Sequence, residues 1–344
     1  MATARERMIA ALKRSCTDCI PTTIMFGNAS AHLIGMAMED FLHSAAKRAQ
    51  CNVDVYEMFH PDTMGVSGPI FTEAMDLGTE VEYLEDGTSK VIKHPLEGKR
   101  ALAKLQIPDP KQSRNMSWYL EVLERVQGAI SEAPVAAGIA GPWTLAATLR
   151  GIEQLIKDTR EDPSFVHERV KFTTEVEKVW GAAVRGVGVG IGLGEAVASC
   201  NVISPKIYRD FVKPYHTDMN NYFRERKVYL SLHICGYIDP IIEDVISTGI
   251  GMLSIDAPTS LRKMVELSQK RVVIMGNVPT MLFSQGTPEE MEAAVKGCIE
   301  TAAKGGAFLL SSGCDIPTNS KAELVHSYMK AARKWGSCER VAAL

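Results

Sequence analysis

Three side chains in the sequence could together bind a metal ion: His233, Cys235 and Cys314. The first two end the apolar run of SLHICGYIDP (231–240), with one residue between them. Residues i and i+2 of a strand point to the same side, so both side chains can aim at one point. Taken alone, the pair is equally consistent with a buried histidine packed beside a core cysteine.

Cys314 favours the metal interpretation. It lies in LLSSGCDIP, directly after another apolar run. One histidine and two cysteines suit Zn²⁺ in a tetrahedral site, and three protein ligands with an open fourth position are typical of catalytic rather than structural zinc. We therefore expect His233, Cys235 and Cys314 to bind zinc, and the sequence does not identify the fourth ligand.

Short apolar runs that alternate with longer helical patterns must position these ligands. The candidate strands are 22–26, 53–57, 135–140, 187–193, 228–233, 252–256, 272–276 and 307–312. The clearest candidate helices are 162–185, 204–225, 238–248, 287–304 and 321–335. Eight strands with intervening helices predict an α/β fold, a closed (β/α)₈ barrel whose C-terminal strand ends form the active-site face. A doubly wound open sheet is the alternative.

The barrel is expected to form a single domain over residues 1–344, with an N-terminal extension that begins as an amphipathic helix. The segment 60–134 is less regular, so we expect it to be an insertion that caps the barrel mouth. The thiols Cys16 and Cys19 precede a strand rather than a helix, which favours a structural role over a redox motif. Cys338 lies in the C-terminal tail and is expected to be exposed and without a role.

Acidic and amide side chains follow several strands, where they could contact a substrate. Glu195 ends the glycine-rich stretch GVGVGIGLGE, and Asp256 ends MLSID. These two are the candidate catalytic residues. Asn277 follows VVIMG and is a candidate for substrate binding, as are His60 and Met64 in the expected cap.

Composition excludes some classes of partner. The net charge is −3, and 23% of the residues are charged, so nothing indicates nucleic acid or an anionic membrane as a partner. No apolar run is long enough for a transmembrane helix, and the charged N-terminus does not resemble a secretory signal. Eight cysteines in such a chain indicate free thiols or metal ligands, so we expect a cytoplasmic protein.

Five stretches resemble the uroporphyrinogen decarboxylase superfamily. They are GPWTLAATLRG (141–151), ISPKIYRDFVKPY (203–215), LHICGYIDPIIEDVISTGIGMLSID (232–256), MGNVPTMLF (275–283) and SSGCDIPTNS (311–320). Within the superfamily, H-x-C followed much later by Cys is similar to the zinc-dependent corrinoid methyltransferases. The resemblance implies a (β/α)₈ barrel, one zinc ion bound by His233, Cys235 and Cys314, and methyl transfer involving a corrinoid carried by a separate protein. Trp143, in the first stretch, is a further candidate for substrate binding.

The resemblance also separates the possible reactions. The decarboxylases have an arginine-rich stretch for substrate carboxylates, whereas MFGNASAHLIGM (25–36) contains no arginine, which disfavours porphyrin decarboxylation. The His/Cys/Cys set is similar to methylcobamide:coenzyme M methyltransferases, in which the zinc-activated substrate is a thiol. Transfer from a methoxyaromatic or another small methylated donor to Co(I) is the alternative. A zinc-stabilised binding protein is the non-enzymatic alternative.

Overall fold

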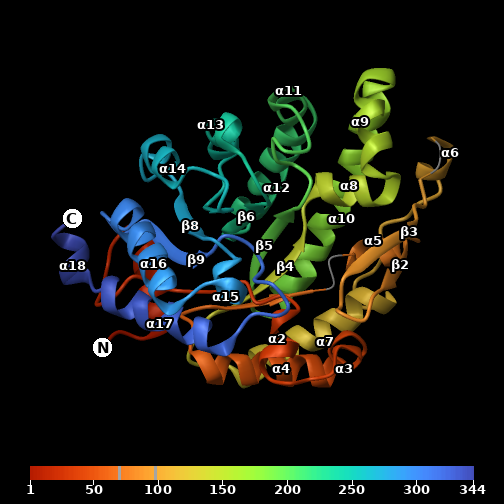
Figure 1. Cartoon of the computed structure of the whole chain (residues 1–344). Coiled ribbons are helices and arrows are strands. Elements are labelled where there is room, and N and C mark those ends of the chain that lie inside the picture. The colour runs from red at the N-terminus through yellow and green to blue at the C-terminus, as the bar shows by residue number, and fades with distance from the viewer. Residues whose placement is uncertain (69–70, 97–98) are drawn as a thin grey trace.

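The computed structural model describes residues 1–68, 71–96 and 99–344, and its centre is a sheet of seven parallel strands (Figure 1). The strands follow one another around the sheet in the order β1-β4-β5-β6-β7-β8-β9. They are β1 (Met64–Ser67), β4 (Val135–Ala140), β5 (Gly190–Glu195), β6 (Leu230–Ile234), β7 (Met252–Ile255), β8 (Val273–Val278) and β9 (Phe308–Ser312). A parallel sheet in sequential order with helices outside it is a TIM-type barrel, which confirms the predicted fold class.

An extended segment near the N-terminus lies between the two edge strands of this sheet. Thr23 donates its backbone N–H to the carbonyl of Leu310 in β9 at 2.9 Å, and its hydroxyl donates to the carbonyl of Thr63, just before β1, at 2.8 Å. The carbonyl of Thr22 accepts from the N–H of Asp62 at 2.7 Å. The predicted strand 22–26 therefore takes the eighth position of the barrel, although only Thr22 forms a ladder bridge, with Leu310.

Helices surround the barrel (Figure 1). The long ones are α1 (Ala4–Leu12), α4 (Ala45–Phe59), α7 (Arg114–Ala129), α8 (Pro142–Arg150), α9 (Ile152–Glu161), α10 (Pro163–Gly186), α12 (Lys213–Glu225), α14 (Leu261–Ser268), α16 (Pro288–Ala302) and α17 (Ala322–Trp335). The short ones are α2 (Ala29–Leu33), α3 (Met38–His43), α5 (Thr72–Asp76), α6 (Lys99–Leu102), α11 (Pro205–Ile207), π-helix η1 (Tyr208–Val212), 3₁₀-helix η2 (Asp239–Ile241), α13 (Ile242–Ile246), α15 (Leu282–Gln285) and α18 (Cys338–Ala342).

Local sequence explains where these elements begin and end. Thr287 accepts from the backbone of Glu290 while the Glu290 side chain accepts from the N–H of Thr287, so a capping box starts α16. Gly305 follows the end of this helix with φ +89°, a conformation that costs glycine little. All five residues of β9 are buried, as expected for a strand covered on both faces.

Two elements of the barrel differ from the sequence expectation. The predicted strand 53–57 is the last half of α4, whose buried side chains include Val55 and Tyr56. The strand that actually follows is β1, which pairs in parallel with β4. The segment 60–134 therefore supplies β1 and α7 to the barrel wall. The part of this segment that lies outside the barrel is shorter than expected and is built around the antiparallel hairpin of β2 (Glu80–Tyr83) and β3 (Ser89–Lys93).

Ionic and covalent contacts hold the two ends of the chain together. Asp62, 1% exposed, accepts from Arg7 of α1 at 2.9 Å and from Arg333 of α17 at 2.8 Å. Cys16 and Cys338 form a disulfide. The expectation that Cys338 is a tail thiol without a role was therefore wrong, because the tail returns to the N-terminal segment. None of the helices in the described parts of the chain has both the length and the apolar composition that crossing a membrane requires.

Candidate metal centre and its surroundings

The three predicted metal ligands meet at the C-terminal end of the barrel strands. His233 lies near the end of β6, Cys235 follows that strand directly, and Cys314 follows β9. The Sγ of Cys235 lies 3.3 Å from Nε2 of His233 and 3.9 Å from Sγ of Cys314. All three ligand atoms lie within 4.8 Å of one another, and within the described residues no fourth His, Cys, Asp or Glu joins them.

These separations fit a tetrahedral zinc ion. Zn–S bonds of about 2.3 Å and Zn–N bonds of about 2.0 Å at tetrahedral angles place two sulfurs about 3.8 Å apart and a sulfur and a nitrogen about 3.5 Å apart. The observed 3.9 Å and 3.3 Å are close to both values. Two thiols and an imidazole also form a donor set typical of zinc. The residues present therefore fit the metal that their pattern predicts.

The neighbouring strand fixes the orientation of the His233 ring. Nδ1 of His233 lies 3.0 Å from Oγ of Ser254, which is its register partner in β7. Nε2 is thereby directed at the two sulfurs. A hydrogen bond to the second ring nitrogen is the usual way in which a metal-binding histidine is held in one tautomer.

The cluster stores protons that a cation would displace. The contact with the Cys314 thiol lowers the pKa of Cys235, and the same contact, together with burial, raises the pKa of Cys314. Burial opposes the charged form of His233, but the hydrogen bond to Cys314 and the negative charges of Cys314, Asp315 and Asp256 together outweigh it and raise the pKa of the imidazole. Thiolate and neutral imidazole are the metal-binding forms, so binding a cation here releases protons.

Asp256 contacts the backbone of the ligand loop. Its carboxylate accepts from the N–H of Gly236 at 2.8 Å and from the N–H of Ala257 at 2.6 Å. Gly236 has φ +87°, and a Cβ at this position would lie 2.6 Å from Oδ1 of Asn201. The predicted catalytic Asp256 thus lies beside the metal centre, with its carboxylate holding the loop that carries Cys235.

The other predicted catalytic group, Glu195, is engaged on both carboxylate oxygens. Oε1 accepts from the N–H of Trp143 at 3.1 Å and contacts Nε2 of His216 at 2.9 Å. Oε2 accepts from the N–H and the hydroxyl of Thr144 at 2.8 and 2.6 Å. The side chain is 0% exposed and joins β5 to the start of α8. The backbone carbonyl of Glu195 also accepts from the N–H of Cys235 at 3.3 Å, so Glu195 helps to fix the backbone of a metal ligand.

Two predicted substrate contacts lie in packed surroundings. The Asn277 amide donates to the carbonyl of Thr259 at 3.0 Å and holds the loop that follows β7. Trp143 is 0% exposed, and its indole N–H donates to the carbonyl of Val197 at 3.2 Å. Both side chains are buried and hydrogen-bonded within the protein.

The other two lie at the opposite end of the barrel. His60 is the exposed left-handed residue that ends α4, and Met64 is the buried first residue of β1. Both precede β1 or begin it, whereas the metal ligands follow their strands. The structure therefore does not bring His60 and Met64 to the metal centre. The barrel strand expected at 53–57 is in fact β1, which begins at Met64, so both residues lie at the start of a strand rather than after its end.

Sequence reasoning missed two charged residues near the barrel mouth. Asp315 follows Cys314, and although the residue is exposed, desolvation by the surrounding protein raises the pKa of its carboxyl group. Arg48 is 2% exposed, donates to the carbonyl of Ser67 at 2.6 Å, and has a pKa lowered to about 10 by burial. Within the described residues its Nε has no partner. The sequence signal that could have identified Arg48 is its place among the apolar, buried positions of helix α4.

Comparison with known proteins identifies the family to which this barrel belongs. The uroporphyrinogen decarboxylase (URO-D) family profile matches residues 3–335. The chain belongs to the URO-D family.

Curated URO-D relatives include both methyltransferases and decarboxylases. The chain is 23% identical over 277 residues to a methylated-thiol–coenzyme M methyltransferase of Methanosarcina mazei, covering 80% of the chain and 66% of that protein. It is 22% identical over 350 residues to the methylcobamide:CoM methyltransferase MtbA of Methanosarcina acetivorans, covering 97% and 98%. A uroporphyrinogen decarboxylase of Synechococcus is also 22% identical, over 299 residues, covering 83% and 81%.

A solved structure has the same fold. A methyltransferase from Methanosarcina mazei superposes with a TM-score of 0.88 at 21% identity, covering 97% of the chain and 99% of that structure. At this identity the likeness establishes the URO-D barrel. The reaction has to be argued from the site.

Proposed function

We propose that the protein is a corrinoid-dependent methyltransferase in which zinc activates a small thiol for methyl transfer. The observation that carries the proposal is the His233, Cys235 and Cys314 cluster, whose ligand atoms lie within 4.8 Å of one another at the C-terminal end of the barrel. The URO-D family membership and the relatives named as methylcobamide:CoM methyltransferases support it. The corrinoid is carried by a partner protein that docks over the same end of the barrel.

The chain's own residues prepare this site for a fourth ligand. Zinc held by His233, Cys235 and Cys314 would lower the pKa of a bound thiol and keep it as a nucleophilic thiolate at neutral pH. Ser254 fixes the imidazole tautomer. Asp256 holds the loop that carries Cys235, so this sulfur is already in place beside that of Cys314 and the loop need not move when a metal binds. Such preorganisation leaves one coordination position for the substrate.

Decarboxylation of a porphyrin fits these residues less well. A tetrapyrrole with many carboxylates needs several cationic partners, and residues 21–40 contain no arginine. Arg48, the buried arginine near the barrel mouth, already donates to the carbonyl of Ser67. A soft His/Cys/Cys cluster has no use in recognising carboxylates, whereas it binds the metal that thiol activation requires.

The experiment compares zinc content and thiol methylation in three proteins. Wild type is expected to bind one zinc per chain and to methylate mercaptoethanol or mercaptoethanesulfonate from methylcobalamin. Cys314→Ala should lose both properties. Cys200→Ala is the matched control, since Cys200 is a half-buried free thiol outside the cluster, and it should keep both. Wild-type protein without zinc would contradict the metal site. The protein could also bind zinc and fail to methylate thiols, yet transfer methyl from a methyl ether or methylamine to Co(I) corrinoid. That result would show that the zinc-bound substrate is a methyl donor and not a thiol.

A further inference from the structure

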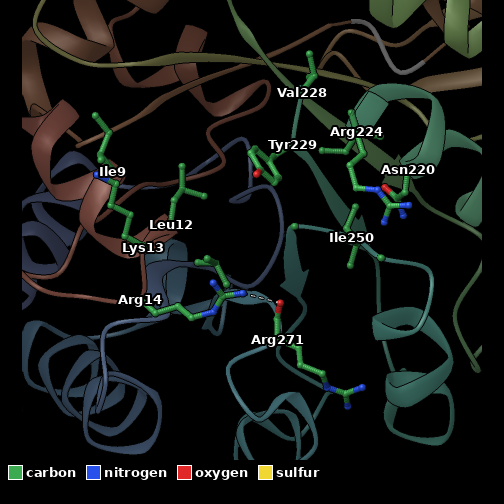
Figure 2. A pocket seen from close by; sticks show the side chains of 14 residues that line it. Ile9, Leu12, Lys13, Arg14, Asn220, Arg224, Val228, Tyr229, Ile250 and Arg271 are labelled. Carbon is green, nitrogen blue, oxygen red and sulfur yellow. Dashed lines mark hydrogen bonds between the residues drawn. The ribbon is translucent and has the colours of Figure 1, made fainter. Parts of the chain in front are cut away.

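A cavity opens at the other end of the barrel, away from the metal ligands. Its volume is about 500 Å³, and it lies where β6, β7 and β8 begin, against α1 and the end of α12 (Figure 2). Tyr229 lines it, four residues before His233, which is about 13 Å along a strand. The lining residues are Ile9, Leu12, Lys13, Arg14, Asn220, Arg224, Val228, Tyr229, Leu230, Gly249, Ile250, Gly251, Arg271 and Val273.

The charged lining of this cavity is wholly basic. Lys13, Arg14, Arg224 and Arg271 contribute four positive charges, and none of the described lining residues is acidic. The guanidinium groups bond neutral acceptors: Arg14 donates to the carbonyls of Lys270 and Arg271, and Arg224 donates to the side-chain oxygen of Asn221 at 2.7 Å. The hydrogen bonds within the protein thus leave the charges uncompensated.

Helix dipoles offset only part of this charge. The C-termini of α1, α12 and α14 approach the cavity, and each contributes roughly half a negative charge, about −1.5 in total. Against four basic side chains, a net positive potential remains. Figure 2 shows the Arg14 side chain reaching toward the backbone of Arg271, while the Arg224 guanidinium lies beside Asn220 and Ile250. Arg224 and Lys13 are therefore the cations most available to a ligand.

The ends of those helices are built at a conformational cost. Of the five described non-glycine residues with positive φ, four belong to these turns: Arg14, Lys227, Gln269 and Lys270. Glycine is the usual residue at such helix ends because it adopts this conformation without strain. Of these four residues, Arg14 lines the cavity, so one of the cations of the cavity is held in this strained conformation.

Most of the remaining wall is apolar, and part of it is open to solvent. Tyr229 is 75% exposed, Ile9 44% and Leu12 42%. Exposed apolar side chains beside uncompensated cations suit a ligand with an apolar body and an anionic group, and the volume lies within the range of small-molecule sites. We propose that this cavity is a binding site for an amphipathic organic anion, such as an aromatic or aliphatic carboxylate, sulfonate or phosphate.

Two fluorescent probes with the same aromatic body separate charge from hydrophobicity. Anilinonaphthalene sulfonate carries an anionic group and phenylnaphthylamine does not. We expect the sulfonate to bind the full-length protein saturably, at one site per chain, and at least about tenfold more tightly than the neutral probe. About 0.5 M sodium chloride should weaken the sulfonate because the lining cations are exposed to solvent. Equal affinity for the two probes would overturn the proposal.

Variants assign the binding to this cavity. Lys13→Gln/Arg224→Gln should weaken the sulfonate about tenfold and leave the neutral probe unchanged, while Tyr229→Ser should weaken both. Arg125→Gln, which removes an exposed arginine of α7, is the matched control and should change neither. Circular dichroism checks the fold, and the single Arg224→Glu variant gives a second measurement if the double variant unfolds. Unchanged sulfonate affinity in a folded Lys13 and Arg224 variant would rule this cavity out.

Discussion

Nδ1 of His233 lies 3.0 Å from Oγ of Ser254, and the two residues are register partners on adjacent strands. The pairing of β6 with β7 therefore fixes the direction in which the metal-binding nitrogen points. Ser254 is 2% exposed, so water competes little for this hydrogen bond. The geometry of the metal site therefore depends on the register of these two strands.

Ser254→Ala is expected to weaken zinc binding about 10–100-fold, as loss of an outer hydrogen bond to a ligating histidine generally does. The imidazole then loses its fixed tautomer and orientation while all three ligands remain. Competition with a chromophoric zinc chelator measures the affinity. Ser231→Ala, two residues before His233 on the same strand, is the control and should bind zinc as wild type does. An unchanged affinity in Ser254→Ala would show that the sulfur ligands alone orient the metal.

Glu195→Ala is expected to lower the free energy of unfolding by at least about 3 kcal/mol. The substitution leaves the N–H groups of Trp143 and Thr144 and the ring of His216 buried without their acceptor. Urea unfolding followed by fluorescence measures the change. A purely catalytic carboxylate would instead give a variant of wild-type stability with lost activity.

Gly141→Ala tests the same packing from the other side. A Cβ on Gly141 would lie 2.3 Å from the carboxyl group of Glu195, so the side chain of Glu195 fits only against a bare backbone. We expect a loss of stability comparable with other overpacked sites, about 1–3 kcal/mol, by the same urea titration. Ala140→Gly, at the preceding residue, controls for flexibility of the strand end. Wild-type stability in Gly141→Ala would mean that Glu195 moves aside at little cost.

The barrel and its metal ligands could be predicted because both follow from short-range patterns. Buried parallel strands leave apolar runs in the sequence, and ligands at strand ends follow those runs directly, as Cys235 and Cys314 do. The strand at 53–57 was wrong because VDVYE alternates like a strand, while Ser44 caps a helix that extends through it. The actual β1 contains only the four residues MGVS and gives little apolar signal.

The roles of the supporting residues could not be predicted for a different physical reason. Glu195 lies at a strand end, as expected, but its partners come from α8 and α12, which are brought to it only by the folded chain. The error at β1 also moved His60 from the end of a strand to the turn before one, and so to the opposite face of the barrel. Positions set by pairing between distant segments leave no local signature.

Glu73→Gln is expected to stabilise the protein increasingly as the pH rises. Burial raises the pKa of Glu73 to about 7 from the usual 4.5, and the side chain is 2% exposed. Between these pH values the folded state holds a proton that the unfolded state has lost, so the free energy of unfolding falls as pH rises, by about 3 kcal/mol in full. Glutamine keeps an acceptor for the N–H of Ala140 and never ionises.

Urea titrations of wild type and Glu73→Gln at pH 5 and pH 8 measure this difference. The stability advantage of the variant should be small at pH 5 and about 2–3 kcal/mol larger at pH 8. Glu177, whose pKa is also raised by burial and whose carboxyl oxygens lack partners among the described residues, is present in both proteins, so its own contribution cancels from this difference. Glu124→Gln, an exposed position on α7, should show no such pH dependence. An equal advantage at both pH values would mean that Glu73 ionises in the folded protein without penalty.

Removing the disulfide between Cys16 and Cys338 is expected to cost about 2–5 kcal/mol of stability. The two cysteines are 322 residues apart, so the bond closes nearly the whole chain and restricts the unfolded state strongly. Thermal unfolding of wild type with and without dithiothreitol measures the cost, and the Cys16→Ser/Cys338→Ser variant should be insensitive to the reductant. Thiol titration in denaturant should count six free cysteines in wild type before reduction. Eight thiols and no response to dithiothreitol would show that the ion pairs of Asp62 with Arg7 and Arg333 suffice to join the ends, because those contacts survive reduction.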